Sequence, residues 1–120
     1  MAYLKDYNSG RYLLTIEGDC IKEYNTGRYK YRINGDKLVD YSSGRYLYDL
    51  SGGCVKDYNS GRRLLTVTTD QVKDYNTGRI LASYDSSCIR DYNSGRYLYK
   101  IDGFLSRREI TAILAILFAV

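Results

Sequence analysis

The 120-residue chain contains no histidine, no proline and no tryptophan, and it has only three cysteines. Without histidine it lacks the commonest general base and the commonest metal ligand in proteins. These absences exclude a Ser-His-Asp triad, a Cys-His protease and a His-based zinc site. We therefore expect a protein that is not an enzyme and that carries no metal or cofactor.

The cysteines and the amino-terminal residues both bear on the cellular compartment. Three cysteines cannot all pair within one chain, and free thiols are typical of a reducing environment. Residues 1–6 lack the apolar stretch that a secretory signal peptide requires. We expect a cytoplasmic protein.

Tyrosine is the residue in excess, since it supplies 15 of the chain's 17 aromatic side chains. Hydrophobic residues make up 44% of the chain and charged residues 27%, which is the composition of a folded protein rather than a disordered one. A chain of this length forms one domain with a modest core. The formal net charge is +4.

One short motif, Asp-Tyr-Asn-Ser-Gly-Arg at residues 6–11, returns every 17 residues to give six copies. The arginine that ends each copy belongs to what we call the arginine column: Arg11, Arg28, Arg45, Arg62, Arg79 and Arg96. The tyrosine at the second position belongs to the tyrosine column: Tyr7, Tyr24, Tyr41, Tyr58, Tyr75 and Tyr92. The acidic residue at the first position belongs to the acidic column: Asp6, Glu23, Asp40, Asp57, Asp74 and Asp91.

A second turn signal follows each motif glycine by eight residues and reads Asn-Gly or Asp-Gly in two copies. Such pairs favour two-residue hairpin turns in which both central residues have positive φ. Each unit then holds two short strands, because 17 residues are too few for a strand, a helix and two loops. Residues 1–103 are therefore predicted to form a meander of twelve antiparallel strands.

The hydrophobic pattern sets the expected register of these strands. The expected pairs are Ile16–Asp19, Leu14–Ile21 and Tyr12–Glu23 around a two-residue turn at 17–18, and Tyr7–Arg11, Lys5–Leu13 and Leu4–Leu14 around a three-residue loop at 8–10. Cross-strand partners share a face. We expect one apolar face that includes Tyr12 and Leu14 with their counterparts. The opposite face is expected to be basic, with Lys5, Tyr7 and Arg11.

Residues 104–120 break the repeat and are predicted to form a helix. Ser106 and Glu109 form a capping box, and the residues that follow are apolar on every side. The apolar run is roughly half of the ~20 residues needed to span a bilayer, so we expect no transmembrane span. The helix is instead expected to be buried as part of the same domain, through Ile110, Ile113, Leu114, Leu117 and Phe118.

The dimensions fit a barrel closed around this helix. Twelve strands spaced ~4.8 Å and tilted ~37° enclose a radius of roughly 11 to 12 Å. A helix with its side chains is about 10 Å across, so it fits along the axis. Closure needs stagger between strands, and the expected register has almost none unless bulges supply it. The sequence is therefore compatible with both a closed barrel and an open meander.

Twelve antiparallel strands around a hydrophobic C-terminal helix resemble the tubby C-terminal domain, the LURP-one-related proteins and the phospholipid scramblases. The pattern Asp-x-x-x-Gly-x-x-x-Tyr-x-Ile-Asp-Gly at residues 91–103 is similar to repeats of bacterial LURP-one-related proteins. The resemblance implies binding to a membrane surface or to phosphoinositides. This chain is shorter and more regular than those domains, and it has no calcium-binding segment of the scramblase kind.

Each repeated column has a functional and a structural interpretation. The arginine and tyrosine columns suit an anionic partner, with phosphates on arginine and flat groups on tyrosine; alternatively, they form a solvated ladder of cation–π pairs such as Arg11 with Tyr7 and Tyr24. The acidic column suits a cation or the capping of its own turns. Cys20, Cys54 and Cys88 occupy one slot in alternate copies, too far apart in a barrel for a disulfide or a metal.

Together these features predict a non-enzymatic binding or scaffold protein with a basic Tyr/Arg surface. Its expected partner is an anionic lipid headgroup or, alternatively, another copy of the chain in a self-assembling repeat structure with no small-molecule ligand. A net charge of +4 is small for a nucleic-acid-binding protein of this kind. The sequence therefore argues against nucleic acid as the partner.

Overall fold

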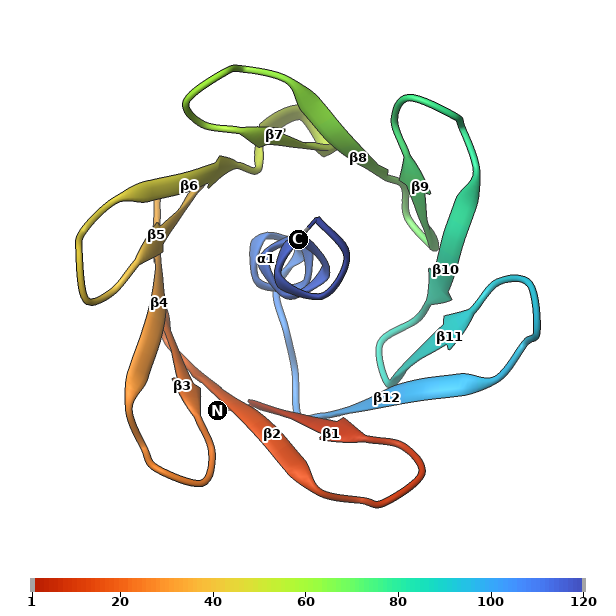
Figure 1. Ribbon diagram of the computed structural model, residues 1–120. Coiled ribbons are helices and arrows are strands. Elements are labelled where there is room, and N and C mark those ends of the chain that lie inside the picture. Colours follow the sequence, from red (N-terminus) through yellow and green to blue (C-terminus); the bar gives the residue numbers. More distant parts are fainter. Residues whose placement is uncertain (1, 120) are drawn as a thin grey trace.

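The computed structural model describes residues 2–119 and contains a closed barrel of twelve antiparallel strands with one C-terminal helix. Each strand pairs with its neighbours in sequence, and β1 pairs with β12 to close the ring (Figure 1). Of the two predicted alternatives, the closed barrel is therefore confirmed and the open meander is not. The strands are β1 (Ala2–Asp6), β2 (Tyr12–Glu17), β3 (Cys20–Glu23), β4 (Tyr29–Asn34), β5 (Lys37–Asp40), β6 (Tyr46–Asp49), β7 (Cys54–Asp57), β8 (Arg63–Val67), β9 (Gln71–Asp74), β10 (Ile80–Tyr84), β11 (Cys88–Asp91) and β12 (Tyr97–Asp102), with a short 3₁₀ helix, η1 (Ser51–Gly53), before β7.

The wide loops that follow the acidic column contain four residues, not the predicted three. In the first, the Asp6 amide donates to the Arg11 carbonyl at 2.8 Å, and the Gly10 amide donates to the Asp6 carbonyl at 2.9 Å. Gly10 has φ of 71°, a left-handed conformation that glycine adopts without steric cost. The loop therefore spans residues 7–10, and the expected Tyr7–Arg11 pair is wrong.

A β-bulge beside this loop changes which side chains face outward. Leu4 pairs with Leu14 as predicted, but Lys5 pairs with Tyr12 rather than Leu13, because the register shifts between Leu4 and Lys5. The same shift recurs in the other five loop-closed hairpins and supplies stagger for closure of the barrel. Tyr12 consequently shares the outer face with Lys5.

The prediction that Tyr12 and its counterparts line the inside is therefore wrong. Tyr29 and Tyr97 occupy the equivalent position and are 43% and 42% exposed. The sequence pattern alone does not distinguish a three-residue loop from a four-residue loop with a bulge. The one-residue difference moves a whole column of side chains through the sheet.

The tight turns also differ in register from the prediction. Ile16 pairs with Ile21 and Leu14 with Glu23, each two residues beyond its expected partner. A shift of two residues keeps every side chain on its face, so the apolar face is retained. Gly18 has φ of 61°, and no residue other than glycine has positive φ within residues 2–119. A positive φ at the first turn residue only is the type II′ pattern, not the I′ pattern expected from Asn-Gly and Asp-Gly.

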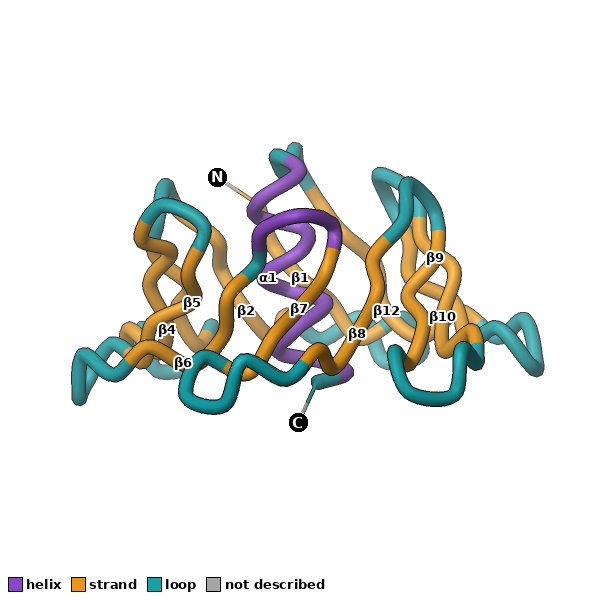
Figure 2. The backbone as a smooth tube through the Cα atoms, turned by 90° about the horizontal axis from the view of Figure 1, so that it is seen from above, coloured by secondary structure: helices purple, strands orange, loops and turns teal. Residues whose placement is uncertain are grey.

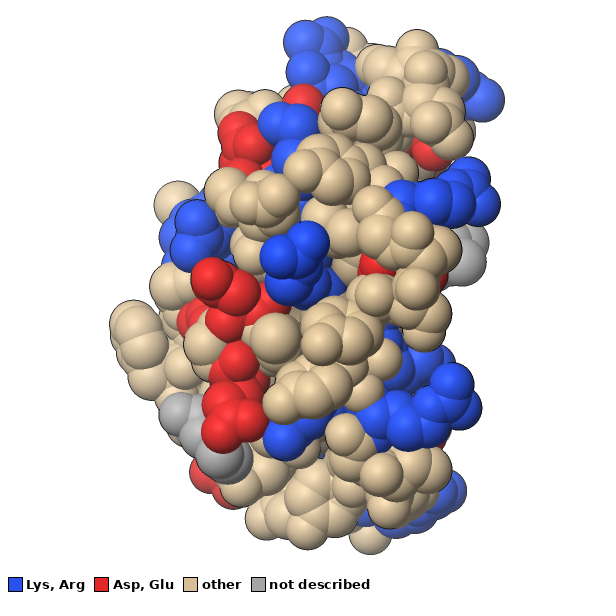
Figure 3. Space-filling model, turned by 90° about the vertical axis from the view of Figure 1, so that its left-hand side faces the viewer, with Lys and Arg blue, Asp and Glu red and all other residues tan. Residues whose placement is uncertain are grey.

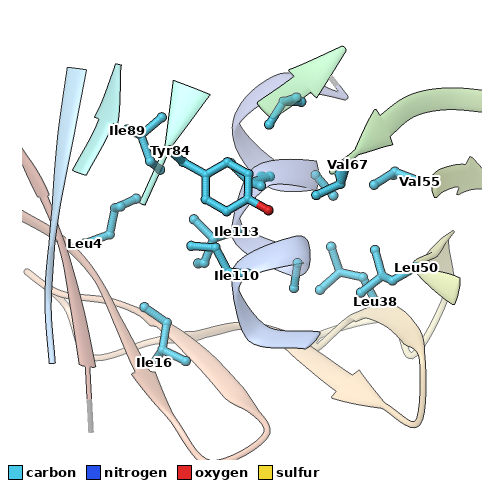
Figure 4. Packing of buried hydrophobic residues seen from close by; sticks show 14 of the residues in the cluster. Leu4, Ile16, Leu38, Leu50, Val55, Val67, Tyr84, Ile89, Ile110 and Ile113 are labelled. Carbon is cyan, nitrogen blue, oxygen red and sulfur yellow. The ribbon is translucent and has the colours of Figure 1, made fainter. Parts of the chain in front are cut away.

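Helix α1 (Arg107–Phe118) begins at the predicted capping box. The Ser106 hydroxyl accepts from the Glu109 amide at 3.2 Å, and the Glu109 carboxylate accepts from the Ser106 amide at 2.8 Å. Figure 1 shows α1 at the centre of the ring of strands. Ile113 and Leu114 are fully buried in one apolar cluster with strand residues such as Leu4 (Figure 4). Val120, which the predicted helix included, lies outside the described residues.

The barrel has two different rims, which Figure 2 shows from the side. At one rim the four-residue loops flare outward, and we call it the loop rim. At the other, narrower rim lie the tight turns, and we call it the turn rim. Helix α1 starts at the turn rim, where Arg108 donates to the Gly35 carbonyl at 3.0 Å, and it ends level with the loop rim (Figure 2). The chain within residues 2–119 has no helix that is long and apolar enough to cross a bilayer.

Candidate anionic-partner surface

All six members of the arginine column lie on the loop rim with exposed side chains. Each follows the loop glycine, and each backbone carbonyl accepts a hydrogen bond from the acidic residue that opens the same loop. Their guanidinium groups make no hydrogen bond, ion pair or ring contact with other residues in the range 2–119. The backbone of these arginines thus closes the loops, while six guanidinium groups stay available in a ring.

The acidic column is occupied by its own loops. The Asp6 carboxylate accepts from the Ser9 hydroxyl at 2.7 Å and from the Ser9 amide at 3.0 Å, and the other four aspartates of the column repeat this arrangement. Glu23 accepts from the Thr26 hydroxyl at 2.7 Å. These hydrogen bonds agree with the prediction that the acidic column caps its own turns. Residues 2–119 contain no cluster of three side chains able to hold a metal ion.

These hydrogen bonds also fix the charge of the aspartates. The hydroxyl donated by Ser9 holds the pKa of Asp6 below its ordinary value, with further lowering by the Ser9 amide and by the charge of Arg11. The same causes lower the pKa of Asp40, Asp57, Asp74 and Asp91, with a threonine hydroxyl in the case of Asp74. The carboxylates are ionised and already bonded, so they offer little to an outside cation.

The tyrosine column forms a girdle around the outer wall. Each of its rings is 44–47% exposed. Four of them contact an aromatic ring of the preceding copy, in the pairs Tyr12–Tyr24, Tyr29–Tyr41, Tyr46–Tyr58 and Tyr97–Tyr7, at centroid distances of 4.8 to 5.1 Å. The Arg63 guanidinium lies 5.6 Å from the Tyr75 ring in the same arrangement. The Tyr97–Tyr7 contact crosses the β12–β1 closure, so the girdle also stabilises the closed ring.

Cation–π contacts occur, but not from the predicted arginines. Lys5 lies 5.2 Å from the centre of the Tyr12 ring, Lys22 lies 5.4 Å from that of Tyr29, and Arg90 stands over Tyr97. The bulge is the reason, because it places Tyr12 rather than Leu13 beside Lys5. The expected stacking of Arg11 on Tyr7 and Tyr24 is therefore incorrect. Its absence is what leaves the arginine column free.

Charge is distributed unevenly between the two rims. The loops and the strand residues beside them carry the arginine column together with Lys5, Lys22, Lys30, Lys56, Arg63, Lys73 and Arg90, against the six carboxylates of the acidic column. The turn rim carries eight carboxylates, Glu17, Asp19, Asp36, Asp49, Asp70, Asp85, Asp102 and the half-buried Glu109, against Lys37, Arg107 and Arg108. On the face drawn in Figure 3, Lys and Arg groups project along the right-hand edge, which is the rim nearest the viewer in Figure 1. The sequence reasoning missed the acidic turn rim, although an acidic residue in every tight turn was the available signal.

The centre of the loop rim is apolar. The last helical residues Leu117 and Phe118 pack on the core but stay partly exposed, and the last turn of α1 carries no charge. Tyr48 pairs with Asp57 of the acidic column, which places Tyr48 on the inner side close to this rim. Burial raises the pKa of Tyr48, with a smaller contribution from Tyr31. From outside to inside, the loop rim presents arginine, tyrosine and aliphatic side chains.

The turn rim holds a cavity of about 270 Å³ beside the start of α1. Arg107 donates to the Tyr84 hydroxyl at 2.7 Å and to the Thr68 carbonyl at 2.8 Å, so it fastens the helix to the end of β10 and to the tight turn that follows β8. Phe104 at the cavity edge is 85% exposed. Cys20, Cys54 and Cys88 are free thiols that are partly buried in the strands.

In comparisons with protein-family models, with curated proteins and with solved structures, the chain matches none of them. The resemblance to tubby-like domains therefore rests on the sequence pattern alone.

Proposed function

We propose that the protein is a non-enzymatic module that docks on an anionic membrane surface through its loop rim. The observation that carries this proposal is the arginine column: six exposed guanidinium groups without side-chain partners among residues 2–119, arranged in a ring. Guanidinium groups bind phosphate in a bidentate manner. Several of them on one rim bind a planar array of phosphates at once, which multiplies weak single contacts.

The apolar centre of the rim favours a membrane over a soluble polyanion. Leu117 and Phe118 are partly exposed in the middle of the arginine ring, and tyrosines lie between. Tyrosine is enriched at membrane interfaces, and apolar groups flanked by basic ones sit at the headgroup boundary. A soluble polyanion would gain nothing from the apolar centre.

In this proposal the fold acts as a rigid scaffold. The six 17-residue units form a barrel around the buried helix α1, and each unit contributes one loop with one arginine. The bulges, the tyrosine girdle and the capped loops hold the backbones of the six arginines at fixed positions. Such preorganisation reduces the entropy lost on binding.

Vesicle co-sedimentation tests the proposal. We expect binding to phosphatidylcholine vesicles that contain about 30% phosphatidylserine, and little binding to phosphatidylcholine alone. The triple variant Arg28→Gln, Arg62→Gln, Arg96→Gln removes three charges worth about 1 kcal/mol each near the surface, so its partition coefficient should fall roughly a hundredfold.

The matched control is the double variant Arg32→Gln, Lys100→Gln. Both residues are exposed cations on the barrel wall between the rims, and this variant should bind close to the wild type. Binding that ignores the anionic lipid content would contradict the proposal. So would equal losses per charge in the loop and wall variants.

A further inference from the structure

We propose that copies of this chain stack head to tail, with the turn rim of one copy seated on the loop rim of the next. This inference is independent of membrane docking and concerns the protein without lipid. It starts from the opposite charge of the two rims. The loop rim and its adjacent strand residues have an excess of cations, whereas the turn rim has eight carboxylates against three cations.

Carboxylates of the turn rim remain available to a partner. Asp70 and Asp102 are exposed and form no ion pair within residues 2–119, whereas the Asp85 carboxylate is already bonded to Ser87 and to the Cys88 amide. Asp19 is 65% exposed at the side chain, and its contact with Arg108 is long, at 3.6 Å. The arginine column offers guanidinium groups in the same uncommitted state. The turn rim thus has an excess of carboxylates, and the loop rim has an excess of cations.

Apolar groups lie inside both rings of charge. At the turn rim, Phe104 is 85% exposed beside the 270 Å³ cavity, whose lining includes Leu105 and Ile110. At the loop rim, the end of α1 presents Leu117 and Phe118, partly exposed. Exposed aromatic groups beside apolar pockets are typical of interaction sites. Stacking places the helix end of one copy over Phe104 and the cavity of the next.

The geometry of the barrel directs assembly to the rims. Every strand is paired on both sides, so no sheet edge is open for strand addition. The molecule is a disc of 37 × 33 × 20 Å, and the two rims are its flat faces (Figure 2). A contact between two different surfaces does not close on itself unless the rotation forms a ring. Coaxial contacts therefore produce open stacks that lengthen with protein concentration.

Light scattering coupled to size exclusion tests the inference in lipid-free buffer. At about 0.02 M salt, where charges act over longer distances, the wild-type mass should rise above the 13.8 kDa monomer as concentration increases. At about 0.5 M salt screening should return it to the monomer mass. A wild type that stays monomeric at both salt concentrations would overturn the inference.

Three variants with the same change of charge magnitude locate the contact. Arg28→Glu with Arg79→Glu reverses two sites on the loop rim, Asp19→Lys with Asp70→Lys reverses two on the turn rim, and Arg32→Glu with Lys100→Glu reverses two on the wall. We expect both rim variants to be monomeric and the wall variant to assemble. All three should keep the wild-type circular dichroism spectrum, which separates lost assembly from lost folding.

An equimolar mixture of the two rim variants tests whether the loop rim of one copy contacts the turn rim of another. The introduced glutamates on the loop rim of one variant match the introduced lysines on the turn rim of the other, so the mixture should regain high mass. A mixture that remains monomeric, or a wall variant that loses assembly as fully as the rim variants, would overturn head-to-tail stacking.

Discussion

At the residue scale, hydrogen bonds among the acidic residue, the serine or threonine and the backbone stabilise each loop without using the guanidinium group of the arginine. The Asp57 carboxylate is bonded to the hydroxyl and the amide of Ser60, so it does not need the guanidinium of Arg62 as a hydrogen-bond partner. The Ser60 hydroxyl is itself a partner of the Arg62 amide at 3.2 Å. The loop is therefore satisfied by short side chains and backbone. The long basic side chain contributes only charge, which is the property that a binding surface uses.

The lowered pKa of the loop aspartates predicts a loss of stability in acid. Because folding lowers the pKa of Asp57, its stabilising effect is fully present above the unfolded pKa of about 4 and disappears as the pH falls through the lower folded value. The variant Ser60→Ala removes the main cause of the shift. We expect the pKa of Asp57, followed by NMR, to rise in this variant while that of Asp91 stays unchanged. An unchanged titration of Asp57 would contradict this assignment of the cause.

At the element scale, the fold depends on what the strands place against α1. Leu114 is fully buried in the apolar cluster, and Ile113 packs there among strand residues (Figure 4). The capping box fixes where the helix starts, and Arg107 binds its first turn to Tyr84. The helix thus forms one apolar core with residues of the barrel wall. The strands alone would expose their inner apolar face.

Substitution of Leu114 by alanine tests this dependence. We expect a loss of about 2–5 kcal/mol in the free energy of unfolding, measured by urea titration, because the residue leaves a cavity in the core. Phe104→Ala is the control: the side chain is 85% exposed, so the change should stay within about 0.5 kcal/mol. A similar loss in both variants would show that α1 is not held in the core.

Removal of the helix is the stronger version of the same prediction. A chain that ends at residue 105 should be insoluble or molten, with binding of a hydrophobic dye and loss of near-ultraviolet circular dichroism. A truncated chain that stays soluble and unfolds cooperatively would contradict a structural role for α1.

Elements could be predicted from the sequence more reliably than their local geometry. The spacing of 17 residues predicted twelve strands, and Ser106 with Glu109 predicted the start of the helix. The face of Tyr12 could not be predicted, because it depends on a bulge at Leu4–Lys5 that has no residue signature of its own. The tight-turn register was wrong by two residues, which left the face of Ile16 unchanged. The hydrophobic periodicity of a strand predicts which side chains share a face of the sheet. The length of the connecting loop decides which residue of the next strand lies opposite each of them.

At the scale of the whole molecule, the repeat places cations in excess at one rim of the barrel and carboxylates in excess at the other, although the net charge is small. A net charge of +4 is modest, but the acidic residues outside the acidic column concentrate on the turn rim, and the loop rim keeps the arginine column. The molecule therefore has a basic side and an acidic side along the barrel axis. The candidate site could be predicted as a set of residues from the repeat. Its placement on one rim, around the end of α1, required the closed barrel.

The orientation of the protein on a membrane tests docking through the loop rim. A single cysteine carrying an environment-sensitive dye is placed at Asn59 on the loop rim or at Ser86 on the turn rim, with the three natural cysteines changed to serine. Both positions are exposed. With vesicles that contain phosphatidylserine, we expect a blue shift of the dye at position 59 and none at position 86. A shift at position 86 alone, or equal shifts at both positions, would contradict docking through the loop rim.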